Sequence, residues 1–110
     1  MDHAHLIVLC TCPDRETAQE IASTLVEYGH AACVNILPGI ASVYTWQGQV
    51  QQDEELQLLI KTTGQAYRKV EETVLRLHPY ELPEIIAVPV VKGQGDYLQW
   101  ISITTSGQNP

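Results

Sequence analysis

Two cysteines near the amino terminus have the residue type and the spacing of a metal site. Cys10 and Cys12 lie two positions apart in the apolar run of residues 5–12, which predicts a β-strand buried on both faces. Because side chains two positions apart project from the same face of a strand, the two thiolates could bind one soft metal ion. The alternative is packing, since free cysteine is among the most buried residue types. The spacing leaves both interpretations open, because structural zinc sites usually combine C-x2-C pairs into sets of four ligands.

The segment from His78 to Glu84 concentrates a second set of reactive groups. Its sequence, HPYELPE, holds an imidazole, a phenol, carboxylates and two prolines. Prolines restrict the backbone, and rigid loops between regular elements often display binding groups. The segment therefore predicts a binding loop, although His78 by itself could equally cap the carboxyl end of the helix that precedes it.

The other histidines and the third cysteine have sufficient structural explanations. His3 and His5 share a strand face but lie at a chain end, where surface histidines are expected. His30 follows a glycine at a helix end, where an imidazolium suits the negative end of the helix dipole. Cys33, in an Ala-Ala-Cys segment, is predicted to lie in the core.

Two charged segments also have plausible roles. The acidic stretch 53–55 is typical of a solvated face, or of a device against edge pairing. The segment 61–63, Lys-Thr-Thr, stands between a strand and a helix, where a small anion or a partner's carboxylate could bind. The sequence contains no P-loop, no dinucleotide-binding glycine motif, no G-x-S-x-G and no H-E-x-x-H, so no enzyme class is indicated.

Composition excludes several classes of protein. The 110 residues suit a single domain, 1–110, in which residues 104–110 have the composition of a flexible tail. Hydrophobic residues make up 45% and charged residues 17%, which excludes a disordered chain. The net charge of −7 repels phosphate backbones and anionic lipid, so we expect neither nucleic acid nor membrane as a partner. An odd number of cysteines without a recognisable leader predicts reduced thiols and a cytoplasmic protein.

Hydrophobic periodicity predicts an α+β fold. The expected elements are a strand at 5–12, a helix at 14–28, strands at 31–46 and 50–62, a helix at 64–78, a strand at 84–91 and a short helix at 96–101. This order is the ferredoxin-like βαββαβ arrangement, in which two helices cover one face of an antiparallel sheet. Pro89 cannot donate to a strand ladder, so the last strand is predicted to lie at an edge or to have a bulge there.

The two middle strands are too long for the rest of the domain. At about 3.3 Å per residue they would reach roughly 45 Å, whereas a chain of this length has a radius of gyration of about 13 Å. The hairpin, bent at Pro38-Gly39 and turning near Gly48, must therefore protrude. Because free strand edges with apolar residues such as Val43 and Trp46 promote association, we expect an obligate oligomer.

An ordered set of motifs carries a family resemblance. The motifs are Thr11-Cys12-Pro13-Asp14, Ala31-Ala32-Cys33-Val34-Asn35, Ser42-Val43-Tyr44-Thr45-Trp46-Gln47-Gly48, Lys61-Thr62, His78-Pro79-Tyr80 with Pro83-Glu84, and Tyr97-Leu98-Gln99-Trp100. Over residues 5–101 the sequence resembles the CutA divalent-cation tolerance proteins. The order of the motifs is more specific than any one of them.

The resemblance implies a ferredoxin-like protomer in a tight homotrimer, similar in architecture to the PII signalling proteins, and a role in tolerance of copper and other divalent metals. It also implies copper ligands from a cysteine on the first strand and from two adjacent histidines before Pro-Tyr. Cys10 and His78 match two of these positions, whereas Leu77 replaces the other histidine. Cys12 is the substitute ligand that we expect, since it shares a strand face with Cys10.

Three functions stay open at this point. The first is a non-enzymatic trimeric protein that binds copper through Cys10, His78 and Cys12. The second is a PII-like trimeric scaffold or small-ligand sensor without a physiological metal. The third is an enzyme with Cys10 as nucleophile and His78 as base, which the absence of a recognisable orienting group or oxyanion loop disfavours. We therefore predict no catalytic residues and no organic cofactor.

Overall fold

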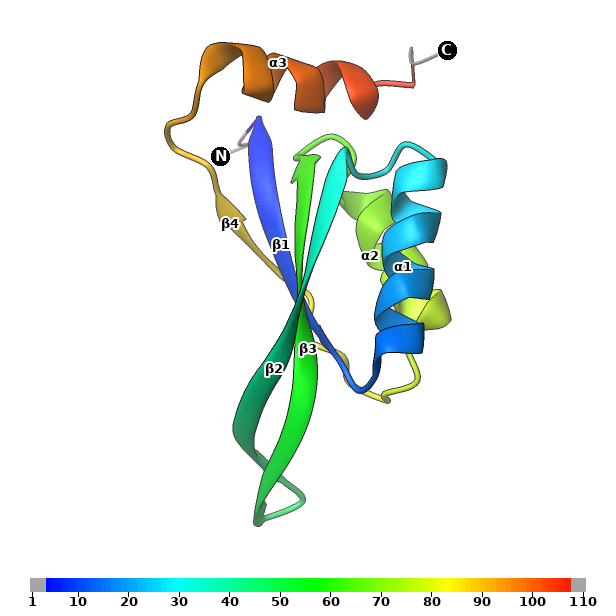
Figure 1. Ribbon diagram of the computed structural model, residues 1–110, viewed down its shortest axis with the longest axis vertical. Coiled ribbons are helices and arrows are strands. Elements are labelled where there is room, and N and C mark those ends of the chain that lie inside the picture. The colour runs from blue at the N-terminus through cyan, green and yellow to red at the C-terminus, as the bar shows by residue number, and fades with distance from the viewer. Residues whose placement is uncertain (1–3, 108–110) are drawn as a thin grey trace.

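An antiparallel sheet carries two helices on one face and a hairpin that protrudes at one end (Figure 1). The computed structural model describes residues 4–107. The strands lie in the order β2-β3-β1-β4, and all neighbouring pairs are antiparallel, as the predicted ferredoxin-like fold requires. Along the chain the elements are β1 (His5–Cys12), α1 (Arg15–Glu27), β2 (Cys33–Trp46), β3 (Gln49–Thr63), α2 (Tyr67–Leu77), β4 (Ile86–Pro89) and α3 (Gly95–Thr104).

The hydrophobic core lies between the sheet and the helices α1 and α2. Alternate residues of β1 are fully buried, whereas Ile7 and Leu9 between them are only partly buried. The prediction that this strand is buried on both faces is therefore wrong for the single chain, because α1 and α2 lie on the same side of the sheet (Figure 1). The core residues include Val8, Cys10, Cys12, Ile21, Leu25, Leu58, Ile60, Val70 and Val74.

Local capping sets the ends of α1 and α3. The Asp14 carboxylate accepts a hydrogen bond from the Thr17 backbone N–H at 2.8 Å, and α1 begins directly after Asp14. Helix α3 includes Thr104, which composition assigned to the tail, and the Thr105 hydroxyl donates to the Ile101 carbonyl at 2.8 Å. Part of the predicted tail, residues 108–110, lies outside the described residues.

Helix α2 ends where the prolines of the 78–84 segment begin. It starts at Tyr67 rather than at residue 64, since residues 64–66 form a turn first. It stops at Leu77, and His78 already has an extended backbone, as the steric demand of Pro79 requires. The helix therefore delivers His78 to the edge of the core.

Strands β2 and β3 form the predicted long hairpin. The pairing shifts register between Leu37 and Ile40, which is the expected bend. At the tip, Gln47 and Gly48 have φ values of 53° and 78°, as in a type I′ turn. Residues 49–54 of β3 are all exposed, so this half of the hairpin lies outside the core. The molecule measures 45 Å along its longest axis and 26 Å along the next, which confirms the protrusion.

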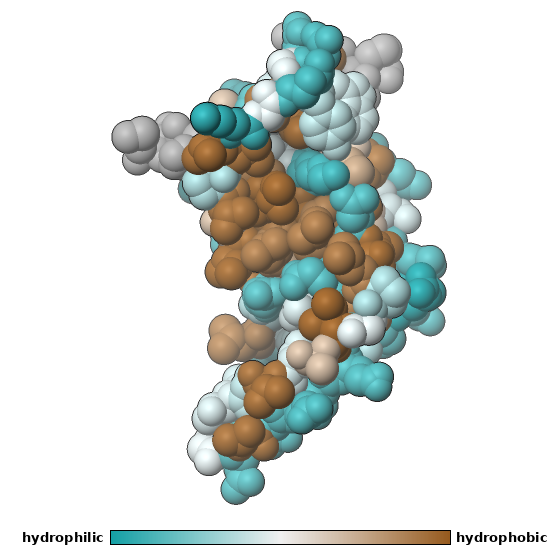
Figure 2. Space-filling model, turned by 60° about the vertical axis from the view of Figure 1, so that its left-hand side comes forward, coloured by the Kyte–Doolittle hydropathy of each residue, from teal (hydrophilic) through white to brown (hydrophobic). Residues whose placement is uncertain are grey.

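The sheet face opposite α1 and α2 is apolar and largely uncovered. Figure 2 shows apolar side chains gathered on this face, and Ile86 and Val88 of β4 are 53% and 43% exposed. Cys33 lies on the same face, because it pairs with Lys61, one residue away from the buried Ile60. The prediction that Cys33 belongs to the core is wrong, since this residue is only partly buried.

Helix α3 lies across one end of the sheet (Figure 1). The Nε2 atom of His5 lies 2.9 Å from the Leu98 carbonyl oxygen and 2.8 Å from the Ser102 hydroxyl. His5 therefore fastens α3 to β1 instead of being the surface histidine expected from its position near the chain end. His3 lies outside the described residues.

Strand β4 is an edge strand, as Pro89 predicts. Pro89 pairs with Leu6 of β1 at the border of the sheet, where a missing N–H interrupts no ladder between two neighbours. The strand covers only Ile86–Pro89 and not the predicted residues 84–91.

Candidate metal centre

Two residues of β1 direct their thiols into the core. Cys10 and Cys12 are both 0% exposed, because alternate side chains of this strand face α1 and α2. Neither forms a disulfide. The shared strand face predicted from their spacing is confirmed.

His78 reaches the same space from the end of α2. Its backbone N–H donates to the Val74 carbonyl at 2.8 Å, which makes it the predicted C-cap of the helix. The Nδ1 atom of its ring accepts a hydrogen bond from the Tyr80 backbone N–H at 3.2 Å. The Nε2 atom therefore carries the proton, which it donates to the Thr11 carbonyl at 2.8 Å. His78 is only 7% exposed, and the two hydrogen bonds of its ring connect the 78–84 segment to β1.

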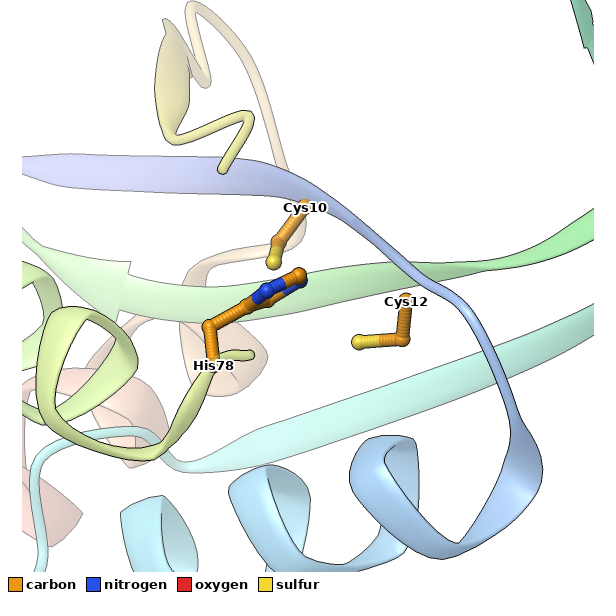
Figure 3. Close-up of side chains that lie close together, drawn as sticks. All are labelled: Cys10, Cys12 and His78. Atoms are coloured by element: carbon orange, nitrogen blue, oxygen red, sulfur yellow. The ribbon is translucent and has the colours of Figure 1, made fainter. Parts of the chain in front are cut away.

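The three side chains converge on one point. Figure 3 shows the side chains of Cys10 and Cys12 leaving β1 toward the region of the His78 ring, and one ligand atom from each residue lies within 4.8 Å of the others. With metal–ligand bonds of about 2.0–2.3 Å, three donors around one ion lie about 3.5–4 Å apart. Movements of about 1 Å, together with release of one hydrogen bond of the His78 ring, would therefore bring all three donors onto one ion. Within residues 4–107, this is the one cluster of three or more His, Cys, Asp or Glu side chains with such spacing.

A hydrogen bond between the two thiols shifts their pKa values in opposite directions. The hydrogen bond with Cys12, together with burial, raises the pKa of Cys10 far above its usual range, and the negative charges of Glu84 and Glu55 add to the increase. The same hydrogen bond lowers the pKa of Cys12, although burial acts in the opposite direction. Of the two thiols, Cys12 is therefore the one that loses its proton more readily. A metal ion that binds both sulfur atoms must displace the Cys10 proton.

Two sulfur atoms and one imidazole nitrogen form a soft donor set. Hard ions such as Mg²⁺ and Ca²⁺ prefer oxygen ligands, whereas thiolates favour Cu(I) and Zn(II). The residues therefore fit copper. The side chain of Leu77, at the position where the resemblance implies a second histidine, packs against the core.

The sequence profile of the CutA1 divalent ion tolerance proteins matches residues 6–104 of this chain. The chain belongs to this family. It is 52% identical over 99 residues to the divalent-cation tolerance protein CutA of Thermus thermophilus, an alignment that covers 90% of this chain and 96% of the relative. The solved structure of the Thermus thermophilus protein has a TM-score of 0.87 over 88% of this chain and 94% of that chain.

Two further CutA structures show the same fold. CutA1 of the psychrotrophic bacterium Shewanella sp. SIB1 is 40% identical, with a TM-score of 0.92 over 96% of this chain and 98% of that chain. CutA of Archaeoglobus fulgidus, described as a periplasmic protein, is 36% identical, with a TM-score of 0.89 over 92% of this chain and 98% of that chain. Membership of the CutA1 family identifies the chain as a non-enzymatic divalent-cation tolerance protein. Among the helices of residues 4–107, none has the length and apolar character needed to span a membrane.

Other polar residues of this CutA1 protein have internal roles. The Thr62 hydroxyl donates to the His30 carbonyl at 2.6 Å, and the Thr63 hydroxyl accepts from the Ala66 backbone N–H at 3.2 Å. These bonds use two hydroxyls of the segment in which we expected an anion or a carboxylate to bind. Burial, with a contribution from Lys69, lowers the pKa of His30, so the imidazolium expected at this helix end is disfavoured.

The acidic stretch is only partly a solvated face. Glu54 is exposed, but Glu55 is only 6% exposed, and its Oε2 atom accepts from the Tyr80 hydroxyl at 2.8 Å. The Tyr44 hydroxyl donates to Asp53. Burial and the bond to Glu55 raise the pKa of Tyr80 well above its usual range. The prediction of a solvated segment is therefore wrong for Glu55.

A cavity of about 590 Å³ adjoins the metal cluster. Ser42 and residues 44–46 of β2 and residues 80–84 form its walls, together with Glu55 and Thr11. Thr11 connects the two sites, since it lines the cavity and its carbonyl accepts the hydrogen bond from the Nε2–H group of His78. Sequence reasoning singled out the 78–84 segment but missed the cavity, because its other wall comes from a distant part of the chain. The burial of Glu55 could have been inferred from its position directly before the apolar run that starts at Leu56.

Proposed function

We propose that this CutA1 family member supports tolerance of metals by binding copper as Cu(I) through Cys10, Cys12 and His78. The observation that carries the proposal is the convergence of three buried donor atoms within 4.8 Å. Thiolates select Cu(I) over hard cations. Cys12 takes the role of the second histidine ligand, which is absent at position 77, since it shares a strand face with Cys10 and lies in the same cluster.

The functional form that we propose is a homotrimer of the PII-like type. The exposed half of the hairpin includes apolar and aromatic residues, with Val43 66% and Val50 77% exposed. The open sheet face exposes Ile86 and Val88. Both surfaces favour association, because they combine apolar area with strand edges that can pair. A closed cyclic assembly would cover these four side chains, none of which lines the cavity, in every protomer.

Native mass spectrometry tests assembly and copper binding together. The protein is measured under reducing conditions with and without Cu(I), and a chelator competition gives the affinity. We expect trimer mass with bound copper for the wild type. Cys10→Ala should keep the trimer and weaken copper binding by at least about tenfold, or about 1.4 kcal/mol.

Cys33→Ala is the matched control for the copper experiment. Cys33 is a free cysteine on the sheet face opposite Cys10, so its removal should leave copper affinity unchanged. Equal affinity in the wild type and Cys10→Ala would refute the site, and loss of affinity in Cys33→Ala would assign it elsewhere. A folded monomer at micromolar concentration would refute the trimer.

A second candidate function is a PII-like scaffold or small-ligand sensor. The cavity of about 590 Å³ beside the 78–84 segment favours it, because small-molecule sites commonly have this size. We propose the cytoplasm as the location, and the free thiols of Cys10 and Cys12 support a reducing compartment. A reporter fusion read in separate cell compartments tests the location.

A further inference from the structure

We propose that the cavity beside the 78–84 segment binds a small organic ammonium ion between acidic and aromatic walls. The proposal rests on the second candidate function and not on copper binding, and it names the class of ligand. Glu55 and Glu84 recognise the charge, and Tyr44, Trp46 and Tyr80 contact the remainder of the ligand.

The charge of the cavity lining has one sign. Glu55, Glu81 and Glu84 line the cavity, and no Lys, Arg or His side chain is among the described residues that do so. Glu55 is only 6% exposed, and the neutral Tyr80 hydroxyl is its hydrogen-bond partner. A positive charge beside a carboxyl group buried to this extent offsets the cost of its burial. A cation in the cavity supplies that charge.

Glu84 provides an independent indication of a missing partner. Its Oε1 atom is buried, and no donor in residues 4–107 hydrogen-bonds to it. Buried polar atoms in native proteins nearly always have a partner, so we expect a donor for this oxygen atom from outside the residues described. Glu84 lines the cavity, which is where a cationic group can approach it. The charges of Glu84 and Glu55 also reach the metal cluster, since both contribute to the raised pKa of Cys10.

The shape and the lining favour an organic ion over a bare metal ion. A volume of about 590 Å³ is far larger than a metal ion needs and falls within the range of about 300–1,000 Å³ typical of small-molecule sites. The lining carboxylates also form no compact set of three ligands, since the one such set among residues 4–107 is Cys10, Cys12 and His78.

Aromatic and apolar groups complete the recognition surface. Tyr44 and Trp46 reach the cavity from the hairpin and are 40% and 39% exposed, and Tyr80 lies on the opposite wall. Aromatic faces attract ammonium groups, with Trp the strongest partner. Leu82 and Pro83 add apolar surface for the carbon skeleton of the ligand. An amine with a short hydrocarbon chain matches this combination.

Calorimetric titration of the full-length, metal-free protein tests the proposal. The probe is putrescine, a diamine, and butanediol is the neutral control of the same chain length. We expect saturable binding of putrescine, little binding of butanediol, and binding weakened at least about tenfold in Glu55→Gln and in Glu84→Gln. Glu54→Gln is the matched control, because it removes the same charge from an exposed neighbour that does not line the cavity. Circular dichroism confirms that each variant is folded.

The opposing results are specific. Absence of saturable putrescine binding by the wild type would overturn the proposal. The same holds if binding is absent because a lysine of a second copy of the chain already fills the cavity. Equal binding of butanediol would show that charge is not recognised. Displacement of putrescine by equimolar Mg²⁺, with unchanged putrescine affinity in Trp46→Leu, would assign the site to a bare cation. Copper affinity of the same variants separates the two functions, since Glu84→Gln should retain copper binding and Cys10→Ala should retain putrescine binding.

Discussion

Replacement of His78 by alanine should destabilise the metal-free protein by about 2–4 kcal/mol. The ring donates to the Thr11 carbonyl at 2.8 Å and accepts from the Tyr80 N–H at 3.2 Å, so the variant loses two hydrogen bonds. Each contributes roughly 0.5–1.5 kcal/mol, and a donor or acceptor left unpaired in a buried place costs more. Loss of the ring, in a residue only 7% exposed, adds about 1 kcal/mol or more of packing energy.

Urea unfolding of chelator-treated protein measures this loss. The protein concentration is held constant, because the stability of an oligomer depends on it. His30→Ala is the control. His30 is partly buried, but its ring stacks on the Tyr28 ring, with 6.2 Å between the ring centroids, instead of anchoring a segment through hydrogen bonds. We expect this variant to lose less than about 1 kcal/mol. If His78→Ala loses no more stability than His30→Ala, the ring does not anchor the 78–84 segment, and the reasoning from its hydrogen bonds is wrong.

Two further predictions concern the hairpin. Gly48→Ala should destabilise the protein by about 1–2 kcal/mol, because Gly48 has a φ of 78°, which strains any residue with a Cβ atom. Gly95→Ala is the control and should not destabilise the protein, since Gly95 has an ordinary φ and open space around it. Thermal unfolding measures both variants, and equal effects would contradict the strain argument. Replacing residues 45–50 by Asn-Gly, which joins the paired Tyr44 and Gln51, should abolish the trimer in sedimentation while leaving the far-ultraviolet circular dichroism of the protomer similar. A trimer that persists with unchanged stability would show that the hairpin tip has no part in assembly.

Short-range patterns in the sequence were sufficient for most of the fold. The apolar run of residues 5–12 predicted β1, although not which of its faces is inward, and helical periodicity predicted α1. Pro89 predicted the edge position of β4. These predictions hold because backbone geometry and hydrogen-bonding limits act within a few residues and are nearly independent of the rest of the chain.

The family resemblance supplied what periodicity could not. The cysteine spacing left packing and metal binding both open, and only the ordered motifs pointed to His78 as a companion of Cys10. The same motifs predicted the membership that the family profile and the solved CutA structures show.

Only the tertiary structure decided which distant groups meet. The sequence by itself determined that Cys10 and Cys12 share a strand face, but the end of α2 had to pack beneath β1 before the His78 ring could join them. Glu55 belongs to an acidic stretch whose composition is typical of a solvated face, yet Tyr80 covers it and donates to its carboxylate. Contacts of this kind depend on how two elements lie in space, and no local propensity encodes that relation. Burial of a charged side chain is therefore a property of the assembled fold, whereas the alternation of side chains along a strand follows from backbone geometry as soon as the strand forms.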